Sequence, residues 1–189
     1  MKTPGTTWQT VGPFFRIGLE PLYEMTVGSE GVLGERFRID GRVLDGDNKP
    51  IPDAVVELWQ ANCHGKYAHP EDAQEKPHER GFCGFARCAT DDEGCFRLSI
   101  IKPGPVPGPD GLMQAPHLVV SLLMRGLLRG LVTRAYFARD PANASDPLLQ
   151  LVEPERRSTL MLESSSEYPT ILQWTIHMQG ENETVFFDF

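Results

Sequence analysis

The sequence lacks a hydrophobic run long enough to cross a membrane. Its most apolar stretch, residues 118–132, has 15 residues and contains Arg125 and Arg129, whereas a membrane-spanning helix needs about 20 consecutive apolar residues. The first 15 residues hold a single lysine and no apolar core of the kind found in secretory signals. We therefore expect a cytoplasmic protein that has no membrane as a partner.

Positive charge is also scarce. Lysine and arginine together number 18, against 26 aspartates and glutamates, which gives a formal net charge of −8. Nucleic acids and anionic lipid surfaces are themselves negatively charged and repel such a chain. We expect neither as a partner.

The usual signatures of nucleophilic and nucleotide-dependent enzymes are missing as well. The chain has no G-x-S-x-G elbow, no phosphate-binding loop and no G-x-G-x-x-G motif. Cysteine is sparse, with four thiols that we expect to stay reduced in the cytoplasm. No generic catalytic motif therefore identifies a reaction.

The region 61–95 concentrates the side chains that could bind zinc. These donors are Cys63, His64, His69, His78, Cys83, Cys88 and Cys95. Structural zinc sites favour closely paired donors of one type, and only the pairs His64/His69 and Cys83/Cys88 come close to that spacing. We therefore favour surface histidines and small buried thiols over a zinc site.

Apolar and polar residues alternate with a period of two along much of the chain, which is typical of short strands. The pattern predicts strands near residues 37–43, 55–59, 85–89, 95–101, 118–124, 131–137, 171–177 and 184–187. The DDEG stretch at 91–94 predicts a hairpin turn between two of them. One helix is expected over 154–162, where Pro154 suits the first turn.

Length and composition indicate one globular domain. Hydrophobic residues make up 40% of the 189 residues and charged residues 23%, which excludes a disordered or fibrous chain. We expect a single domain over 1–189, mainly β, built as an antiparallel β-sandwich with long loops and one or two short helices. The long segments 1–34 and 61–83 are predicted loops, which in a compact domain are usually functional or cover a partner.

Tyr67 ends a sharper pattern. It closes the succession IDGRV at 39–43, VELWQAN at 56–62 and GKY at 65–67. This succession resembles the signature segment of the intradiol aromatic-ring dioxygenases, in which the corresponding tyrosine is a ligand of Fe(III). Taken alone, Tyr67 is also compatible with a packed loop tyrosine whose hydroxyl is hydrogen-bonded.

The resemblance extends along nearly the whole chain. Further landmarks are QTVGP at 9–13, IKPGP at 101–105, APH at 115–117, TRAYF at 133–137 and GENETVFFDF at 180–189. The β-sandwich that this family implies agrees with the strand pattern. Several separated motifs in the right order make the resemblance specific.

The departures from the family pattern concern the iron site, which the resemblance implies to hold two tyrosines and two histidines. Tyr67 matches the first tyrosine and His117 the first histidine. The second tyrosine would fall at Val106 and the second histidine at Val119, and Gln114 stands where catalytic chains have an arginine. Valine offers no donor atom, so we expect no metal ligation by this chain.

A chain with these losses is similar to the alpha chains of heteromeric family members. The resemblance implies that a beta chain holds the Fe(III), that the partner is this beta chain in a hetero-oligomer of alpha–beta units, and that protocatechuate is cleaved with O2 to 3-carboxy-cis,cis-muconate. Thr10, Gly12 and Pro13 match alpha positions that wall the substrate pocket, and Arg134 matches one that faces the substrate carboxylate. Residues 1–34 are then expected to be an extended segment at the subunit interface.

Arg134 also has support from the strand pattern. It shares a face of 131–137 with Val132 and Tyr136, and neither face of that strand is clearly polar. A covered guanidinium needs a partner, and a planar carboxylate suits it bidentately. An acid of this chain could take that place, but with the resemblance we favour the substrate.

Two other interpretations stay open. The chain could be a self-sufficient catechol-type dioxygenase with a rearranged iron site, against which Val106 and Val119 argue. It could also be a non-catalytic β-sandwich interaction module that has kept the fold without the chemistry. An iron-bearing beta partner distinguishes the subunit from both.

Overall fold

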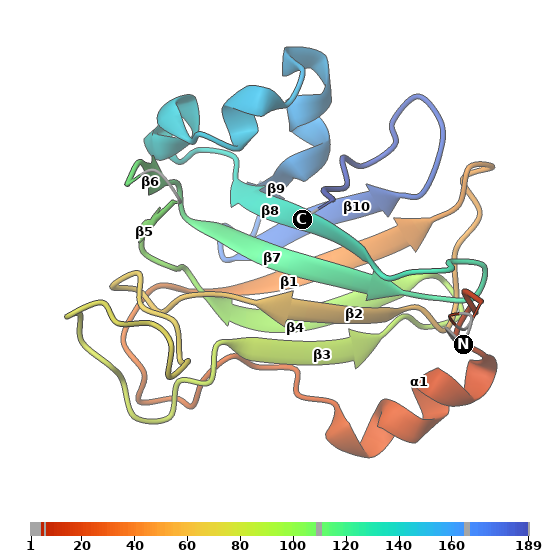
Figure 1. Cartoon of the computed structure of the whole chain (residues 1–189), viewed down its shortest axis with the longest axis horizontal. Helices are drawn as coiled ribbons and strands as arrows, with labels where there is room; N and C mark the ends of the chain where they lie inside the picture. Colours follow the sequence, from red (N-terminus) through yellow and green to blue (C-terminus); the bar gives the residue numbers. More distant parts are fainter. Residues whose placement is uncertain (1–4, 6, 109–110, 165–166, 189) are drawn as a thin grey trace.

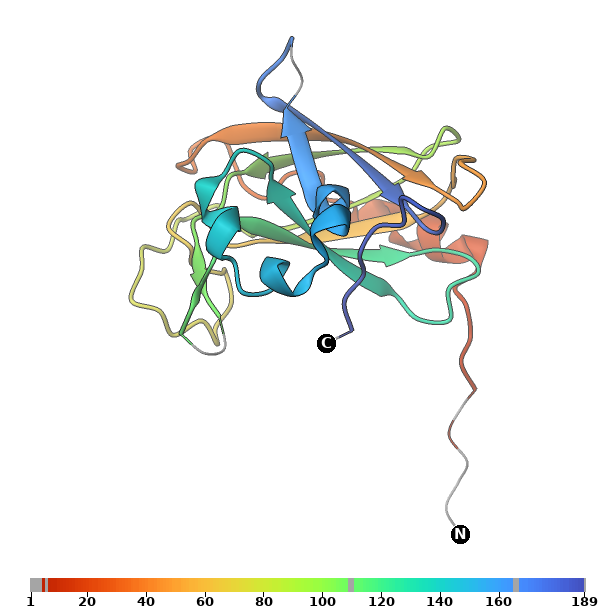
Figure 2. The same ribbon diagram turned by 90° about the horizontal axis from the view of Figure 1, so that it is seen from above.

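The computed structural model describes residues 5, 7–108, 111–164 and 167–188. Residues 1–4 and 6 of the predicted N-terminal segment, residues 109–110 and 165–166, and Phe189 of the C-terminal motif lie outside the described residues. Two stacked layers of strands form the body of the described chain, and short helices surround them (Figures 1 and 2).

The strands are β1 Arg36–Leu44, β2 Val55–Trp59, β3 Phe85–Ala89, β4 Cys95–Ile101, β5 Val106–Pro107, β6 Met113–Gln114, β7 His117–Leu123, β8 Leu131–Phe137, β9 Met161–Ser164 and β10 Ile171–His177. The helices are α1 Pro13–Leu19 and the 3₁₀ turns η1 Glu20–Leu22, η2 Pro141–Ser145, η3 Leu149–Leu151 and η4 Pro154–Leu160. The prediction of a mainly β chain with short helices is confirmed.

Backbone hydrogen bonds link eight strands in the order β3-β2-β7-β8-β9-β10-β1-β4. The short strand β9 pairs with β8 at one end and with β10 at the other, so it joins the two layers of the sandwich. Most pairs are antiparallel, as predicted, but β1 with β10 and β8 with β9 are parallel. The two strands of a parallel pair here are not joined by a short turn, and the local sequence pattern does not indicate whether such strands run parallel or antiparallel.

Alternate residues of both layers form the core. Leu118, Val120 and Leu122 of β7 face Leu98 and Ile100 of β4 within one buried cluster, and each such side chain contributes about 1.5–3 kcal/mol by leaving water. The remaining residues of β7, at 117, 119, 121 and 123, therefore lie on the outer face of their layer. That face carries the candidate site.

Two predicted elements differ from the structure, and one helix was not predicted. The helix expected over 154–162 is the 3₁₀ turn η4 followed by β9, because residues 161–164 pair with the neighbouring strands. No helix was predicted over 13–19, where α1 begins at Pro13. The strand expected at 184–187 is wrong: only Phe187 forms a bridge, and the Val185 backbone is bonded to the side chains of Thr133 and Thr159.

The predicted turn at 91–94 forms, but the strands on either side of it do not make a hairpin. Gly94 donates its N–H to the Asp91 carbonyl at 2.9 Å, and Gly94 has a φ of 72°, which favours glycine. The turn crosses from one layer to the other, because β3 and β4 are the two outer strands of the hydrogen-bonded order. Among the described residues, no helix is long and apolar enough to cross a membrane.

Candidate functional site

The outer face of β7 and β8 brings the matched positions together. His117 lies opposite Tyr136 and Val119 opposite Arg134, while Trp59 of β2 lies on the other side of Val119. Trp59, Val119 and Arg134 thus form one row across three strands. Strand register alone therefore places two of the four matched ligand positions next to Arg134.

The remaining two positions approach the same face from loops. Tyr67 stacks on Trp59 with ring centroids 6.1 Å apart and planes 3° from parallel. Val106 pairs with Gln114 in the small β5–β6 hairpin, and the Gln114 side-chain oxygen accepts a hydrogen bond from Arg134 Nη1 at 2.6 Å. We name this region, Tyr67 with Val106, His117, Val119 and Arg134, the inner site.

A pocket of about 820 Å³ opens beside the inner site. It is lined by Trp59, Tyr67, His69, Glu71, Asp72, Ala73, Gln74, Val106 and Pro107. Most of its wall comes from the predicted loop 61–83, which Asp72 stabilises by accepting the Tyr67 N–H at 2.7 Å. This hydrogen bond and others to backbone and side-chain donors hold the pKa of Asp72 below its usual value, against the effect of burial.

Electrostatics at the inner site favour neutral side chains. Burial raises the pKa of Tyr67, and the nearby Arg134 opposes that shift. Burial and the Arg134 guanidinium lower the pKa of His117 to about 4, so at neutral pH its imidazole is uncharged. His117 Nδ1 lies 2.7 Å from the Ala115 carbonyl, where it donates a hydrogen bond.

These residues do not fit ferric iron. Of the four matched positions, only Tyr67 and His117 carry a donor atom, while Val106 and Val119 present hydrocarbon. The Arg134 cation acts on both Tyr67 and His117, so it would repel a trivalent ion at the same place. Valine supplies neither the charge nor the oxygen or nitrogen atoms that a hard cation requires.

Asp146 anchors the inner site from behind and was not identified from the sequence. It is fully buried, and its carboxylate accepts hydrogen bonds from Ala115 N at 2.8 Å, Tyr136 OH at 3.1 Å and Leu149 N at 2.7 Å. The carboxylate thereby fixes the connection between β6 and β7 that leads into His117. An aspartate three residues before a helical turn is a weak capping signal on its own.

Thr10, Gly12 and Pro13 lie at the other end of the same strands. The Thr10 hydroxyl accepts the Gly126 N–H at 2.8 Å and is 3.5 Å from the Met124 carbonyl, so it fixes the N-terminal segment to the β7–β8 turn. Gly12 caps α1, and Pro13 begins it. All three are exposed. We name them, with the adjoining β7–β8 turn, the outer site.

Arg134 does not belong to the outer site. Its partner Val119 precedes Met124 by five residues, which is about 16 Å of extended strand. The guanidinium is bonded to Gln114, on the side away from that turn, and the two sites lie at opposite ends of the sandwich in Figure 1. Within one chain, no single-ring ligand touches both Arg134 and Thr10.

Arg125 is the arginine that sequence reasoning missed at the outer site. It lies between Met124 and Gly126, the two residues that Thr10 contacts, and its guanidinium pairs with Asp53 at 3.0 Å while more than half of the side chain stays exposed. The signal was hidden because the N-terminal segment and this turn are separated by more than 100 residues. Only the folded chain shows that they meet.

Comparison with known proteins gives a consistent result. A family model described as Dioxygenase matches residues 19–180. The chain is 37% identical over 197 residues to the protocatechuate 3,4-dioxygenase alpha chain of Burkholderia cepacia, covering 97% of this chain and 96% of that protein. It is 40% identical over 131 residues to the beta chain from the same organism, covering 68% of this chain and 56% of that protein.

A solved structure shares the fold. The 3-chlorocatechol 1,2-dioxygenase of Rhodococcus opacus 1CP matches with a TM-score of 0.65 over 80% of this chain and 62% of that chain, at 21% sequence identity. The likeness is one of fold.

Proposed function

Since this chain belongs to the intradiol dioxygenase family, we propose that it is the alpha subunit, without iron, of a heteromeric enzyme that cleaves protocatechuate with O2 to 3-carboxy-cis,cis-muconate. One observation carries the proposal. Val106 and Val119 leave the inner site with two of four donors, while the chain matches an alpha chain almost from end to end. The same donor set argues against a self-sufficient dioxygenase.

In this proposal the Fe(III) that the family implies is held by a beta chain, where it supplies the metal chemistry of ring cleavage. The present chain binds and orients the substrate from across the interface. Relatives of this chain are named the alpha and the beta chain of one enzyme in the same organism, which supports an assembly of two distinct subunits.

The exposed N-terminal region supports such an interface. Apolar side chains that stand in solvent gather over 8–25, and they are Trp8, Phe14, Ile17, Leu22 and Met25. Phe14 on α1 is 80% exposed, although burying such a ring against a partner is worth about 1.5–3 kcal/mol. Exposed apolar clusters of this kind mark protein–protein contacts.

Thr10, Gly12 and Pro13 then form part of the pocket wall, and an arginine binds the substrate carboxylate through two parallel N–H···O bonds. The resemblance assigns this task to Arg134. The geometry adds Arg125, which alone of the two lies beside Thr10. Both arginines are candidates for binding the substrate carboxylate, and the KM values of their variants distinguish them.

Kinetics of the assembled complex test the proposal through Arg125→Ala and Arg134→Ala. Loss of a charge-assisted hydrogen bond costs about 1.5–3 kcal/mol, so the arginine that faces the carboxylate should raise KM for protocatechuate about 10–100-fold with kcat nearly unchanged. Arg97→Ala, on an exposed side chain of β4, is the matched control. If neither variant changes KM, the proposed substrate contact from this chain is wrong.

A further inference from the structure

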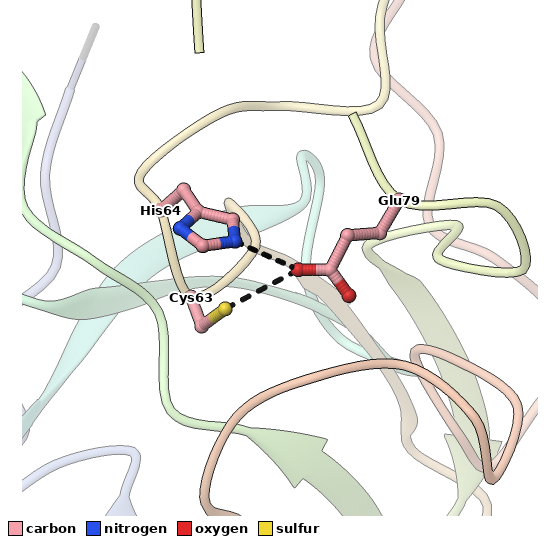
Figure 3. Close-up of side chains that lie close together, drawn as sticks. All are labelled: Cys63, His64 and Glu79. Atoms are coloured by element: carbon pink, nitrogen blue, oxygen red, sulfur yellow. Dashed lines mark hydrogen bonds and ion pairs between the residues drawn. The ribbon is translucent and has the colours of Figure 1, made fainter. Parts of the chain in front are cut away.

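Three metal-binding side chains of different types meet outside both sites. Cys63 and His64 follow β2, and Glu79 lies near the end of the loop that starts there. Glu79 Oε1 is 3.3 Å from Cys63 Sγ and 3.1 Å from His64 Nε2, and the three donor atoms lie within 4.8 Å of one another. Figure 3 shows all three side chains converging on one point.

The backbone holds this cluster in place. Asn62 accepts the His64 N–H on its side-chain oxygen at 3.0 Å and the Gly65 N–H on its carbonyl at 2.9 Å, which fixes the turn that carries Cys63 and His64. The second oxygen of Glu79 accepts the Leu33 N–H at 2.7 Å, and this bond orients the carboxylate. Preorganised donors lower the ordering cost of a ligand.

The distances suit a tetrahedral ion. Zinc binds sulfur at about 2.3 Å and nitrogen or oxygen at about 2.0–2.2 Å, so tetrahedral angles place S and O about 3.5 Å apart and N and O about 3.3 Å apart. The observed 3.3 Å and 3.1 Å need changes of only a few tenths of an ångström. Cys63 Sγ and His64 Nε2 lie within 4.8 Å of each other, and a tetrahedral ion would hold them about 3.5 Å apart. The His64 side chain is 37% exposed and that of Glu79 is 11% exposed, which leaves one open side for access and for a water molecule.

We propose that Cys63, His64 and Glu79 form a zinc-binding site with one position left for water or a partner's ligand. The thiol proton leaves to solvent when the metal binds. Glu79 was absent from the donors considered in the sequence, because its spacing from the thiol and the imidazole matches no paired motif. This site is distinct from the inner site and does not depend on the proposed ring cleavage.

The site would control the loop that lines the large pocket. Zinc would connect position 64 to position 79, and Tyr67, Asp72 and Gln74 of the pocket wall lie between them. A crosslink that closes such a loop restricts its open conformations. We therefore expect zinc to protect residues 65–78 from proteolysis.

Metal titration of the full-length chain tests the proposal. After chelator treatment, calorimetry with Zn²⁺ should give one site per chain, and Co²⁺ should give visible d–d bands with a thiolate charge-transfer band in the near ultraviolet. Cys63→Ser and Glu79→Gln should each weaken Zn²⁺ binding by more than about 100-fold, because even outer partners of metal ligands account for about 10–100-fold. The charge-transfer band should vanish in Cys63→Ser.

The matched controls are Cys83→Ser and His78→Asn, which remove a thiol and an imidazole from the same region outside the cluster. Both should keep the Zn²⁺ affinity, the Co²⁺ spectrum and the protease protection of the unaltered chain. The proposal is overturned if the chain binds no Zn²⁺, if Cys63→Ser binds as tightly as the unaltered chain, or if Cys83→Ser loses binding to the same extent. Circular dichroism of each variant shows that a loss of binding is not a loss of fold.

Discussion

The inner and outer sites of the sandwich differ in the exposure of their polar groups. At the inner site Arg134 bonds to Gln114 and Asp146 accepts three hydrogen bonds, so the buried charges there are satisfied within the chain. At the outer site Thr10 and Arg125 are exposed, and aromatic side chains around them stand in solvent. The first arrangement stabilises the fold, and the second suits contact with another molecule.

This difference supports a structural role for the inner site. By the resemblance, the inner site corresponds to the family's iron site, and we propose that Val106 and Val119 stand where two of its donors would be. In this proposal Tyr67 and His117 contribute to packing. We expect substitutions of Asp146 and His117 to change stability and those at the outer site to change activity of the complex. The following predictions are ordered from the largest effect to the smallest.

Asp146→Ala should be the most damaging change at the inner site. It leaves the N–H groups of Ala115 and Leu149 and the Tyr136 hydroxyl without their acceptor, and each such loss in a buried setting costs about 1–3 kcal/mol. We expect the free energy of unfolding in urea to fall by about 3–5 kcal/mol. Asp92→Ala, in the exposed turn after β3, should change it by less than about 0.5 kcal/mol. If Asp146→Ala and Asp92→Ala lowered the free energy of unfolding equally, a structural role of the inner site would be contradicted.

Acid should lower the stability of the folded chain through His117 of the inner site. Because burial and Arg134 lower the pKa of its folded form to about 4, the unfolded chain binds a proton that the folded chain does not between about pH 6.5 and pH 4. The contribution of His117 to the free energy of unfolding is therefore fully present above pH 6.5. It is lost as the pH falls, and the loss between pH 7 and pH 5 is about 2 kcal/mol. Urea unfolding at the two pH values measures this loss.

His117→Gln should remove that part of the pH dependence, since glutamine does not titrate. His78→Gln, on an exposed histidine, is the control and should keep the slope of the unaltered chain. A His117→Gln chain with an unchanged slope would show that another group carries the acid sensitivity.

Thr10→Val should have the smallest effect on the chain and a visible one on the complex. The hydroxyl makes its contacts at an exposed turn, so the free energy of unfolding should fall by no more than about 1 kcal/mol. KM for protocatechuate should rise several-fold in the complex, because the wall segment is no longer fixed. Thr10→Ser should restore it, and Thr7→Val should leave it unchanged. A large loss of stability in Thr10→Val without a change in KM would show that Thr10 stabilises the fold and does not support substrate binding.

The strands could be predicted well because their pattern is local. Residues 55–59, 85–89, 95–101, 131–137 and 171–177 were predicted with the bounds of β2, β3, β4, β8 and β10. The parallel pairing of β1 with β10 could not, since period-two alternation fixes which face a residue takes and not which strand lies beside it. The helix α1 was missed because PFFRIGL contains two phenylalanines and a glycine, which are poor helix formers.

The candidate sites were predictable only in part. Matched motifs identified Tyr67, Val106, His117 and Val119, and strand register then brought their segments together around Arg134. The separation of Arg134 from Thr10 follows from where the N-terminal segment docks, which no local pattern encodes. The cluster at Glu79 was missed for the same reason.

Iron content tests the central claim most directly. The purified chain should be measured for iron and for visible absorption by itself and after co-expression with its beta partner. The account predicts a colourless, iron-free chain that joins a coloured, iron-containing complex able to cleave protocatechuate. Stoichiometric iron with tyrosinate-to-iron absorption in the chain alone would contradict it, because the inner site would then be a working metal centre.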